Sequence, residues 1–393
     1  MNFGKRHENL VLFFCTVVLS LLGMVMVYSA TSVSAGANPK LGYDAAYFFK
    51  RQVLFLAVGA SLAVLLIRID YDYYRRHIRI FLGAAFFLLI MVFIPGIGHK
   101  ANGAARWINL RFFTFQPSEL AKFVLIAFAA FCVDRKGENP KDWVKVSMPA
   151  LAVTFAFLAV ILKQPDFGMA VVIGTVILAL LFVAGFPWKY MAAALGLCAA
   201  GAALLIAAKP YRMARLKAFI DPVSQAQTAG YAVLQSLIAF SNGGFLGMGF
   251  GSGRQKLYYL PELHTDYIFC VIGEELGFAG VVSVGACFLT MAFVGFRIAR
   301  RARDLFGRYL AMGIASVIGI QALMNIMVGL KMLPPKGMVL PFISYGGSSL
   351  IIHMAAVGVL INISMKGAET FVADSDHRGR GNRRTRFSGD SAG

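Results

Sequence analysis

Charged residues are scarce in this sequence of 393 residues. Only 15% of the residues are charged, whereas 58% are hydrophobic, and the mean hydropathy is +0.69. A water-soluble globule cannot bury that much apolar surface in one core. The composition therefore excludes a soluble domain with an attached anchor and indicates an integral membrane protein.

Cysteine and internal symmetry are lacking as well. The five cysteines are odd in number, form no Cys-X-X-Cys pair and lie within apolar runs. A disulfide framework and a zinc site are therefore not expected, and His264 has no second ligand at metal-binding spacing. No internal repeat is evident, so the sequence does not support an inverted-repeat transporter.

Long apolar runs are what the sequence has in abundance. About 20 apolar residues span the hydrocarbon core as a helix. We find such stretches at 10–30, 51–69, 79–95, 119–134, 147–162, 168–186, 188–208, 266–297, 309–331 and 340–365. Continuous runs exclude a β-barrel, which needs alternating segments. We expect an all-α polytopic membrane bundle of about ten helices over residues 1–366, with a long loop before the eighth.

The basic residues predict the orientation of the bundle. The loops on the side of the termini carry the larger share of the 38 Lys and Arg residues, so both termini are expected in the cytoplasm and the loop 209–265 outside. The net charge of +19 is spread over many short loops, which does not favour nucleic-acid binding. Within the segment 367–393, the run HRGRGNRRTRFSGDSAG is rich in Gly, Arg and Ser and has too few apolar residues to build a core. The segment is therefore predicted to be a disordered basic tail near anionic lipids.

Polar residues enter the predicted spans near the first two outer boundaries. Arg106 lies near the first boundary, where Glu119 and Lys122 are three residues apart on one helix face. They can pair, which lowers the cost of placing charge close to hydrocarbon. The pair is either purely structural or part of a polar cavity. At the next boundary the segment 163–166 supplies Lys163 and Asp166 as one more charge pair, which is commonly just a turn.

The long outer loop 209–265 is itself a candidate functional segment. It begins with Arg212 and Arg215, and its middle predicts an amphipathic helix on the membrane surface. The glycine-rich run GGFLGMGFGSGRQK, which contains Arg254, superficially resembles a phosphate-binding loop. No strand precedes it and no Gly-Lys-Ser/Thr follows. The run is either a plain flexible loop or a wrapping of amides and cations around a lipid pyrophosphate.

The loop ends in LPELHTDYIFCVIGEELG, the most informative stretch of the chain. We place Asp266 in the first turn of a spanning helix, where the helix dipole favours the ionised carboxylate. A bare capping role is the alternative, although Thr265 is equally suited to it. Glu274 and Glu275 lie roughly 12–14 Å deeper along the helix, too deep for a substrate held at the surface.

The last punctuated segment precedes the final span. Lys336 follows two prolines and is expected at the outer mouth of the bundle. The small hydroxyl residues of SYGGSS then enter the last helix, where they allow close helix packing.

Three motifs in this order resemble the shape, elongation, division and sporulation family of bacterial cell-wall synthesis. They are ARWINLRFFTFQPSELAK, YLPELHTDYIF with GEELG after it, and PPKGMVLPFISYGGSS, within a resemblance that covers about residues 10–366. GEELG and the basic extension are more similar to the division members than to the elongation members. The resemblance implies an inner-membrane peptidoglycan glycosyltransferase of the division septum, which polymerises lipid II. It also implies a class B penicillin-binding protein and other divisome membrane proteins as partners.

The resemblance also implies roles for particular residues. Asp266 matches the family's catalytic aspartate, and a carboxylate at the water boundary can take the proton of an attacking hydroxyl. A pyrophosphate leaving group calls for cations, either side chains or a divalent ion such as Mg²⁺ or Mn²⁺. The candidate substrate-binding residues are Arg106, Glu119, Lys122, Arg212, Arg215, Arg254, His264 and Lys336. The competing hypotheses are a lipid II flippase that uses the same cavity and a scaffold for division proteins.

The orientation is testable with single cysteines in a cysteine-free background. Ser252→Cys in the long loop should react with an impermeant thiol reagent added to intact spheroplasts, because that loop is predicted to lie outside. Ser388→Cys in the tail should react only after the membrane is opened. The reverse labelling pattern would invert the topology.

Overall fold

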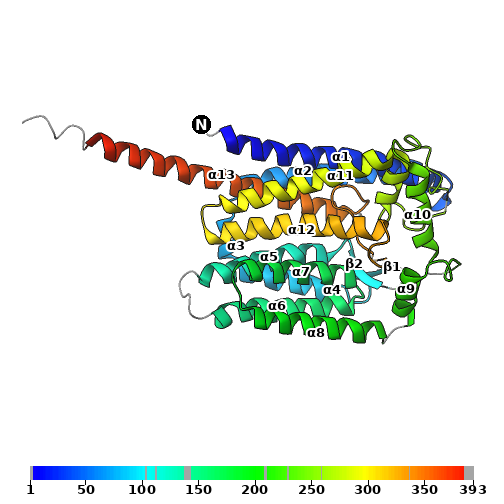
Figure 1. The fold of residues 1–393 in the computed structure, drawn as a ribbon, viewed down its shortest axis with the longest axis horizontal. Helices are drawn as coiled ribbons and strands as arrows, with labels where there is room; N and C mark the ends of the chain where they lie inside the picture. Colours follow the sequence, from blue (N-terminus) through cyan, green and yellow to red (C-terminus); the bar gives the residue numbers. More distant parts are fainter. Residues whose placement is uncertain are drawn as a thin grey trace, which may run out of the picture.

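The computed structural model describes residues 3–384, with gaps at 102–103, 111–112, 137–142, 208–209, 228–229, 258 and 336. Its helices are α1 (Phe3–Gly36), α2 (Tyr47–Arg68), α3 (Asp72–Arg76), α4 (Ile78–Met91), α5 (Pro117–Lys136), α6 (Trp143–Lys163), α7 (Phe167–Val183), α8 (Trp188–Ala207), α9 (Pro210–Ile220), α10 (Tyr231–Gly243), α11 (Ile268–Arg300), α12 (Leu305–Gly329) and α13 (Gly347–Arg384), with a 3₁₀ turn at Pro39–Leu41. The long helices run side by side along one axis (Figure 1).

The predicted membrane bundle is confirmed. Each of the ten expected spans overlaps one long helix. Among the described residues, α1, α2, α11, α12 and α13 are long and apolar enough to cross a membrane, and α4, α6 and α7 contain shorter apolar helices. The charged residues Glu119, Lys122 and Asp134 set α5 apart from this group. Helices suit lipid because they satisfy their backbone hydrogen bonds internally.

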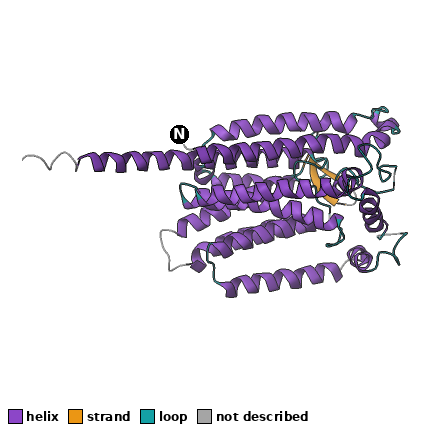
Figure 2. Ribbon diagram, turned by 45° about the horizontal axis from the view of Figure 1, so that its top comes forward, coloured by secondary structure: helices purple, strands orange, loops and turns teal. Residues whose placement is uncertain are grey.

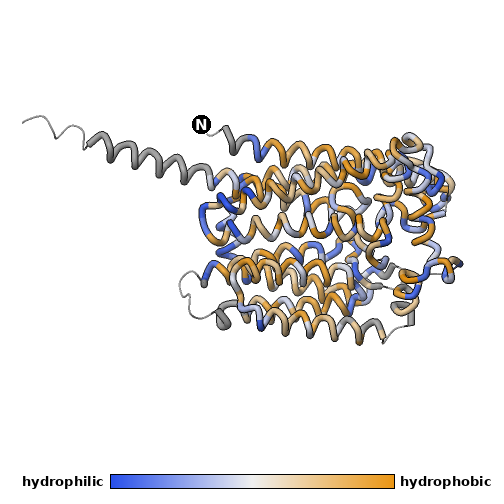
Figure 3. Tube along the Cα trace, viewed as in Figure 1, coloured by the Kyte–Doolittle hydropathy of each residue, from blue (hydrophilic) through white to orange (hydrophobic). Residues whose placement is uncertain are grey.

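Hydropathy divides the bundle into three zones. Hydrophobic residues dominate the middle of the long helices, and hydrophilic residues gather at the two ends (Figure 3). One end carries α9, α10 and a small sheet, and we call it the sheet end. The opposite end carries α3 and the connection between α11 and α12 (Figure 1). This is the distribution expected of a chain that crosses a bilayer.

The small sheet was not predicted from the sequence. Its strands β1 (Gly98–Ala101), β2 (Ala104–Asn109) and β3 (Thr114–Phe115) are antiparallel, with β2 in the centre. Gly98 pairs with Ile108, and Ile108 pairs with Phe115. The strands lie among helices at the sheet end (Figure 2). The strands are too short to give a clear alternating pattern of polar and apolar residues. The pairing with β1 and β3 holds β2 at the ends of the helices.

Glycines let the backbones of the bundle approach closely. A Cβ at Gly358 of α13 would lie 2.5 Å from the carbonyl oxygen of Ala63 in α2. A Cβ at Gly23 of α1 would lie 2.7 Å from the carbonyl oxygen of Phe342, in the loop before α13. Close packing of this kind replaces the hydrophobic driving force that lipid cannot supply. It joins α1, α2 and α13 into one side of the bundle.

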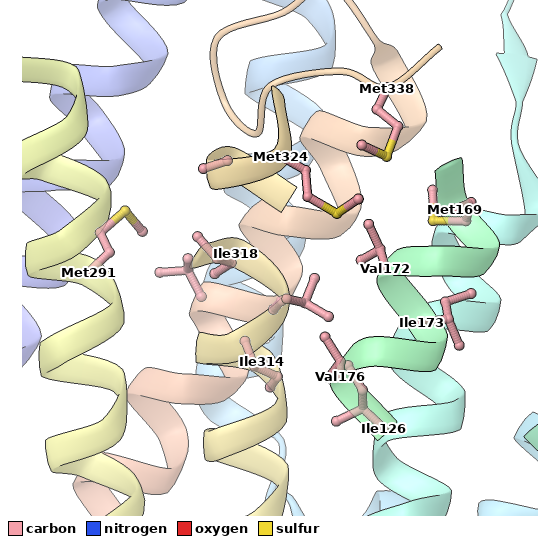
Figure 4. Close-up of a cluster of buried hydrophobic side chains, with 14 of the residues drawn as sticks. Ile126, Met169, Val172, Ile173, Val176, Met291, Ile314, Ile318, Met324 and Met338 are labelled. Atoms are coloured by element: carbon pink, nitrogen blue, oxygen red, sulfur yellow. The ribbon is translucent and has the colours of Figure 1, made fainter. Parts of the chain in front are cut away.

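Below the sheet end the interior is apolar. Met324 and Ile314 of α12 lie on the side of Val172 and Val176 of α7, whereas Ile318 lies on the side of α12 that faces α11 (Figure 4). These five residues are buried. The cluster therefore closes the space between the two helices with hydrocarbon side chains.

α11 is longer than a membrane requires. Its 33 residues extend about 50 Å at 1.5 Å per residue, against a hydrocarbon core of about 30 Å. Gly277 interrupts it with φ 65 and ψ −161, a conformation open to glycine. The part after Gly277 is by itself long enough to span, and the part before it packs with α10 at the sheet end.

The last helix extends past the expected end of the membrane domain. α13 continues from Gly347 to Arg384, beyond residue 366, where we placed the start of a disordered tail. Residues 385–393 lie outside the described residues. The disorder of the basic tail stays a prediction.

Candidate active site

A polar cavity of about 530 Å³ lies at the sheet end of the bundle. Its walls come from β2, the start of α5, the start of α10, the turn before α11 and the loop between α12 and α13. Its charged lining residues are Arg51, Arg106, Glu119, Glu262 and Asp266. Of the nine predicted site residues, the structure thus places Arg106, Glu119 and Asp266 around one chamber.

Asp266 lies in a turn and not in the first turn of the helix. α11 begins at Ile268 and its N-cap is Tyr267, so neither Asp266 nor Thr265 occupies the capping position. The hydroxyl of Thr265 donates instead to the carbonyl oxygen of Glu262, at 3.2 Å. The partly buried Asp266 lines the chamber. Its place before the helix keeps it at the chamber wall and out of the apolar interior.

The turn of Asp266 is fastened to the loop between α12 and α13. Asn325 Nδ2 donates to the carbonyl oxygens of Asp266 at 3.2 Å and of Met338 at 2.7 Å. Ser344 Oγ donates to the carbonyl oxygen of Thr265 at 2.6 Å and accepts from the amide of Leu340 at 2.8 Å. Buried carbonyls need such donors. Two side chains therefore fix the backbone on both sides of the aspartate turn.

Arg106 is held by the segment between α6 and α7. Its Nε donates to the carbonyl oxygen of Gln164 at 3.4 Å, its Nη2 to that of Pro165, and its Nη1 lies 4.0 Å from Asp166 Oδ1. Asp166 Oδ1 also accepts the amide of Met169 at 3.3 Å as the N-cap of α7. Burial raises the pKa of Asp166, and the guanidinium of Arg106 acts against that rise.

The expected pairing of Lys163 with Asp166 is wrong. Lys163 Nζ lies 5.7 Å from the ring centre of Phe93 instead. Asp166 Oδ2 accepts from Gln116 Nε2 at 3.1 Å, which ties the start of α5 to the start of α7. The segment is thus more than a turn, because it holds the guanidinium of Arg106 in the chamber wall.

The side chains of Arg106 and Asp266 both lie close to Gly337. A Cβ at Gly337 would lie 3.4 Å from Arg106 Nη1 and 3.6 Å from Asp266 Oδ2. A cation and a carboxylate therefore flank the same small volume of the chamber. Any side chain at Gly337 would intrude between them.

The pairing predicted for Glu119 and Lys122 is confirmed. Lys122 Nζ lies 2.7 Å from Glu119 Oε2 and 2.6 Å from Gln321 Oε1, and all three residues are buried. Gln321 Nε2 in turn donates to the carbonyl oxygen of Val339 at 3.0 Å. Glu119 lines the chamber, whereas Lys122 is not among its lining residues. Lys122 therefore lies behind the chamber wall and binds the side chains of Glu119 and Gln321, which line the chamber.

The glycine-rich run does not cradle a phosphate in this structure. The amides of Gly251, Arg254 and Gln255 donate to the carboxylates of Glu275 and Glu274, at 3.1, 3.0 and 3.2 Å. The run is therefore neither a plain flexible loop nor an open pyrophosphate site, because the protein's own carboxylates occupy its amides.

Glu274 and Glu275 are buried and bonded to neighbouring segments. They precede the kink at Gly277, and Ser29 Oγ of α1 donates to Glu275 Oε1 at 2.6 Å. A Cβ at Gly253 would lie 2.8 Å from Glu274 Oε2, so the loop is packed directly on them. The two carboxylates thus have polar partners from α1 and from the glycine-rich run, and their depth relative to the membrane stays a prediction.

α10 confirms the helix predicted in the long loop but lies elsewhere than expected. Its buried Val233, Ser236 and Ala239 form one face, and the helix packs against α11. A Cβ at Gly243 would lie 1.9 Å from the carbonyl oxygen of Gly273 in α11. α10 therefore covers the outer part of α11, and its first residues line the chamber.

Several predicted site residues lie away from the chamber or outside the description. Arg254 is exposed. The ring of His264 packs 5.0 Å from Phe48 and 5.7 Å from Tyr345, and its carbonyl oxygen accepts the amide of Tyr345 at 2.9 Å. Arg212 and Arg215 belong to α9, but their side chains lie outside the described residues, as does the whole of Lys336.

Residues that the sequence analysis missed line the chamber, as Gln321 and Arg51 do, or support its wall from outside the lining, as Asn325 does. Gln321 and Asn325 are four residues apart on α12, one turn of a helix, and both connect the chamber to the following loop. The side-chain amides of Gln321 and Asn325 stand alone among apolar residues in the predicted span 309–331. Buried polar groups need hydrogen-bond partners, so these amides could have indicated contacts with a polar site. Arg51 of α2 also lines the chamber. It reaches the chamber because α2 packs against α13, and sequence spacing does not reveal this packing.

No metal cluster is evident within the described ranges. No group of three or more His, Cys, Asp or Glu side chains there could hold a metal ion. The carboxylates Glu119, Glu262 and Asp266 line the chamber. A divalent ion at the pyrophosphate stays an expectation.

Fold and site together define a polytopic membrane protein with a charged chamber at one end of its helix bundle. Comparison with known proteins gives the family. The model of the FtsW/RodA/SpoVE family, described as cell cycle proteins, matches residues 9–369. The chain belongs to this family, which confirms the resemblance.

Curated relatives match over almost their whole length. The chain is 44% identical over 364 residues to a probable peptidoglycan glycosyltransferase FtsW of Geobacter sp. (strain M18), with 92% of this chain and 98% of the relative covered. It is 38% identical over 366 residues to the stage V sporulation protein E of Bacillus subtilis (strain 168), with 93% and 99% covered. The similarity to the division members is thereby confirmed.

Solved structures share the fold. One chain of a structure described as "Structural coordination of polymerization and crosslinking by a peptidoglycan synthase complex" matches with a TM-score of 0.72 and 28% identity, covering 91% of this chain and 97% of that chain. The rod shape determining protein RodA of Thermus thermophilus matches with a TM-score of 0.65 and 28% identity, covering 90% and 95%.

The fastening of the aspartate turn predicts a separable loss of activity. Asn325→Leu leaves two buried carbonyls without their donor, at a cost of about 1–3 kcal/mol for each such group, and frees the backbone of Asp266. Asn362 is a matched control at the other end of the bundle, because its Nδ2 donates to the carbonyl oxygen of Ile67 at 2.7 Å. Both Leu variants should melt at lower temperature in detergent.

Only the Asn325 variant should also lose glycan polymerisation, by about tenfold or more, which corresponds to about 1.4 kcal/mol in the barrier. The initial polymerisation rates of the two variants are compared with that of the wild type at a temperature well below each melting temperature. If the two variants lost activity in the same proportion, the fastening would have no specific role at Asp266.

Proposed function

We propose that the chain is a peptidoglycan glycosyltransferase that polymerises lipid II into glycan strands during septal cell-wall synthesis, with Asp266 as the general base. The observation that carries this proposal is that Asp266 Oδ2 and Arg106 Nη1 lie 3.6 and 3.4 Å from the position that a Cβ at Gly337 would take. Glycosyl transfer from a lipid pyrophosphate needs a base for the acceptor and a positive charge for the leaving group. In the chamber, Asp266 can supply the base and Arg106 the positive charge.

The reaction assigns a role to each of these groups. The hydroxyl oxygen of the acceptor sugar forms a bond to the anomeric carbon of the donor, and its proton passes to the carboxylate of Asp266. The bond between the anomeric carbon and the phosphate oxygen breaks, and both electrons leave with undecaprenyl pyrophosphate. The Arg106 guanidinium stabilises the negative charge that develops on that oxygen. No electron carrier is needed.

The lower boundary of the chamber favours a polymerase over a flippase. The buried Glu119–Lys122 pair forms part of the chamber wall. Further toward the middle, side chains of α12 and α7 such as Met324 and Val172 fill the space with hydrocarbon (Figure 4). A flippase must open a polar path through this packed region, whereas a polymerase needs access from the sheet end alone.

The orientation follows from the same assignment. The chamber lies at the sheet end with the loop 209–265, so that end faces the outside of the inner membrane in the proposal, and both termini face the cytoplasm. The excess of basic residues on the side of the termini supports this placement. The division relatives support a location at the septum.

A transpeptidase partner belongs to the proposal as well. The similar chain of known structure is part of a complex of polymerization and crosslinking. The described outer segments of this chain, α9, α10 and the short sheet, are too small to form a domain that crosslinks peptides. We therefore assign crosslinking to a class B penicillin-binding protein, alongside other divisome membrane proteins.

The partner assignment predicts a stable complex. An affinity tag on this chain should co-purify one class B penicillin-binding protein from membranes, and the complex should polymerise lipid II faster than the chain alone. The control is a tagged unrelated polytopic protein from the same membranes. Full activity of the isolated chain, with neither co-purification nor stimulation, would refute the partner.

Replacement of the base separates the polymerase from the flippase. Asp266→Asn keeps the shape of the side chain and removes its basicity, and loss of a positioned general base typically costs about 10²–10⁴-fold. The chain is purified with its partner and given lipid II in detergent micelles, where no sidedness exists. The wild type should make polymer and the Asn variant should make almost none.

Glu262→Gln is the control, because Glu262 lines the same chamber and has no assigned proton. It should retain most of the activity. A flippase would give no polymer with any of the three proteins. Equal polymer from the wild type and Asp266→Asn would remove Asp266 from its role and direct attention to Glu119.

A further inference from the structure

A second cavity lies at the end of α11 farthest from Asp266. It has a volume of about 460 Å³ and is lined by Phe293, Phe296, Arg297, Arg300 and Arg301. Its lining residues follow the kink at Gly277 by 16–24 residues, which is about 24–36 Å of helix, so the cavity plays no part in the chemistry of the chamber. We propose that this cavity binds one anionic phospholipid of the adjacent leaflet, and we call it the arginine cavity.

The charge of the arginine cavity is not balanced. Glu8 Oε1 of α1 lies 2.8 Å from Arg297 Nε and 2.7 Å from Arg301 Nη1, and these are the ion pairs that the cavity makes in the described part of the chain. One carboxylate thus serves three guanidiniums. The dipole at the end of α11 contributes about half a negative charge, which leaves an excess of more than one positive charge.

The geometry of Arg297 shows how the cluster is built. Glu8 is buried, whereas Arg297 and Arg301 are partly exposed. The carboxylate therefore holds the two guanidiniums from the side of the protein and leaves their other donors available. A guanidinium has five N–H donors in a planar fork, which suits a phosphate oxygen pair. Arg300 is exposed and lies between them in the chain.

The apolar wall lies one helical turn toward the middle of the bundle. Phe293 is 67% exposed and Phe296 is 39% exposed. They precede Arg297 and Arg300 by four residues, so each ring stands on the same helix face as one guanidinium. Aromatic rings above a basic cluster match a phospholipid, with acyl chains against the rings and phosphate at the arginines.

The sign of the charge argues against a partner's spanning helix in the same place. In the proposed orientation this end is cytoplasmic, and spanning helices carry their own Lys and Arg residues at that boundary. Such a helix would bring like charges to the arginines. An anionic headgroup removes the excess charge and fills the apolar wall at the same time, which is why we assign the cavity to lipid.

The test is native mass spectrometry of the full chain in detergent, titrated with dioleoylphosphatidylglycerol or with dioleoylphosphatidylcholine. Arg300→Glu reverses one charge of the arginine cavity. Arg308→Glu is the matched control, because Arg308 is exposed at the start of α12 and its reversal changes the net charge equally. The wild type and Arg308→Glu should bind one phosphatidylglycerol tightly. Arg300→Glu should bind it about tenfold more weakly or worse, since each basic side chain contributes about 1 kcal/mol to anionic lipid binding.

Phosphatidylcholine should not show the tight binding to any of the three proteins. Equal weakening in the two charge-reversal variants would show diffuse attraction to the basic surface and overturn the proposal, as would equal affinity for the two lipids. A photo-crosslinker at position 293 that captures a protein in native membranes would assign the cavity to a partner helix instead. If Arg300→Glu does not fold, Arg300→Gln and Phe293→Ala test the charge and the wall separately.

Discussion

Hydrogen bonds between the turn before α11 and the loop between α12 and α13 are the constraint on which the chamber depends. Asn325 and Ser344 donate to the carbonyl oxygens of Asp266 and Thr265, and the amide of Tyr345 donates to the carbonyl oxygen of His264. Each bond is worth only about 1 kcal/mol. Together they set the position of a carboxylate that its own helix does not hold.

The rest of the outer structure supports that turn from the other side. The glycine-rich run is bound by its amides to Glu274 and Glu275, and α10 packs on α11 through Gly243. The kink at Gly277 lets the outer part of α11 leave the line of the membrane span. The chamber wall is thus built on buried polar contacts outside the hydrocarbon core, where their partners can be supplied by neighbouring loops.

Much of the fold was predictable from the sequence, and the site was predictable in part. Apolar runs of membrane-spanning length located the ten long helices, and the spacing of Glu119 and Lys122 predicted their contact, because both signals are local. The partners of Asp166 and Glu275 were not predictable, since Arg106 and Ser29 reach them from distant elements. The partners of Glu274 were not predictable either, since the amides of Arg254 and Gln255 reach it from the preceding loop.

The central claim is that donor pyrophosphate and acceptor hydroxyl meet in one chamber between Arg106 and Asp266. An electron cryo-microscopy structure of the Asp266→Asn chain, with its partner and with lipid II bound, tests it most directly. The account predicts pyrophosphate density against Arg106 and a sugar hydroxyl within hydrogen-bond distance of residue 266. Lipid II seated elsewhere, with water alone between these two side chains, would contradict it.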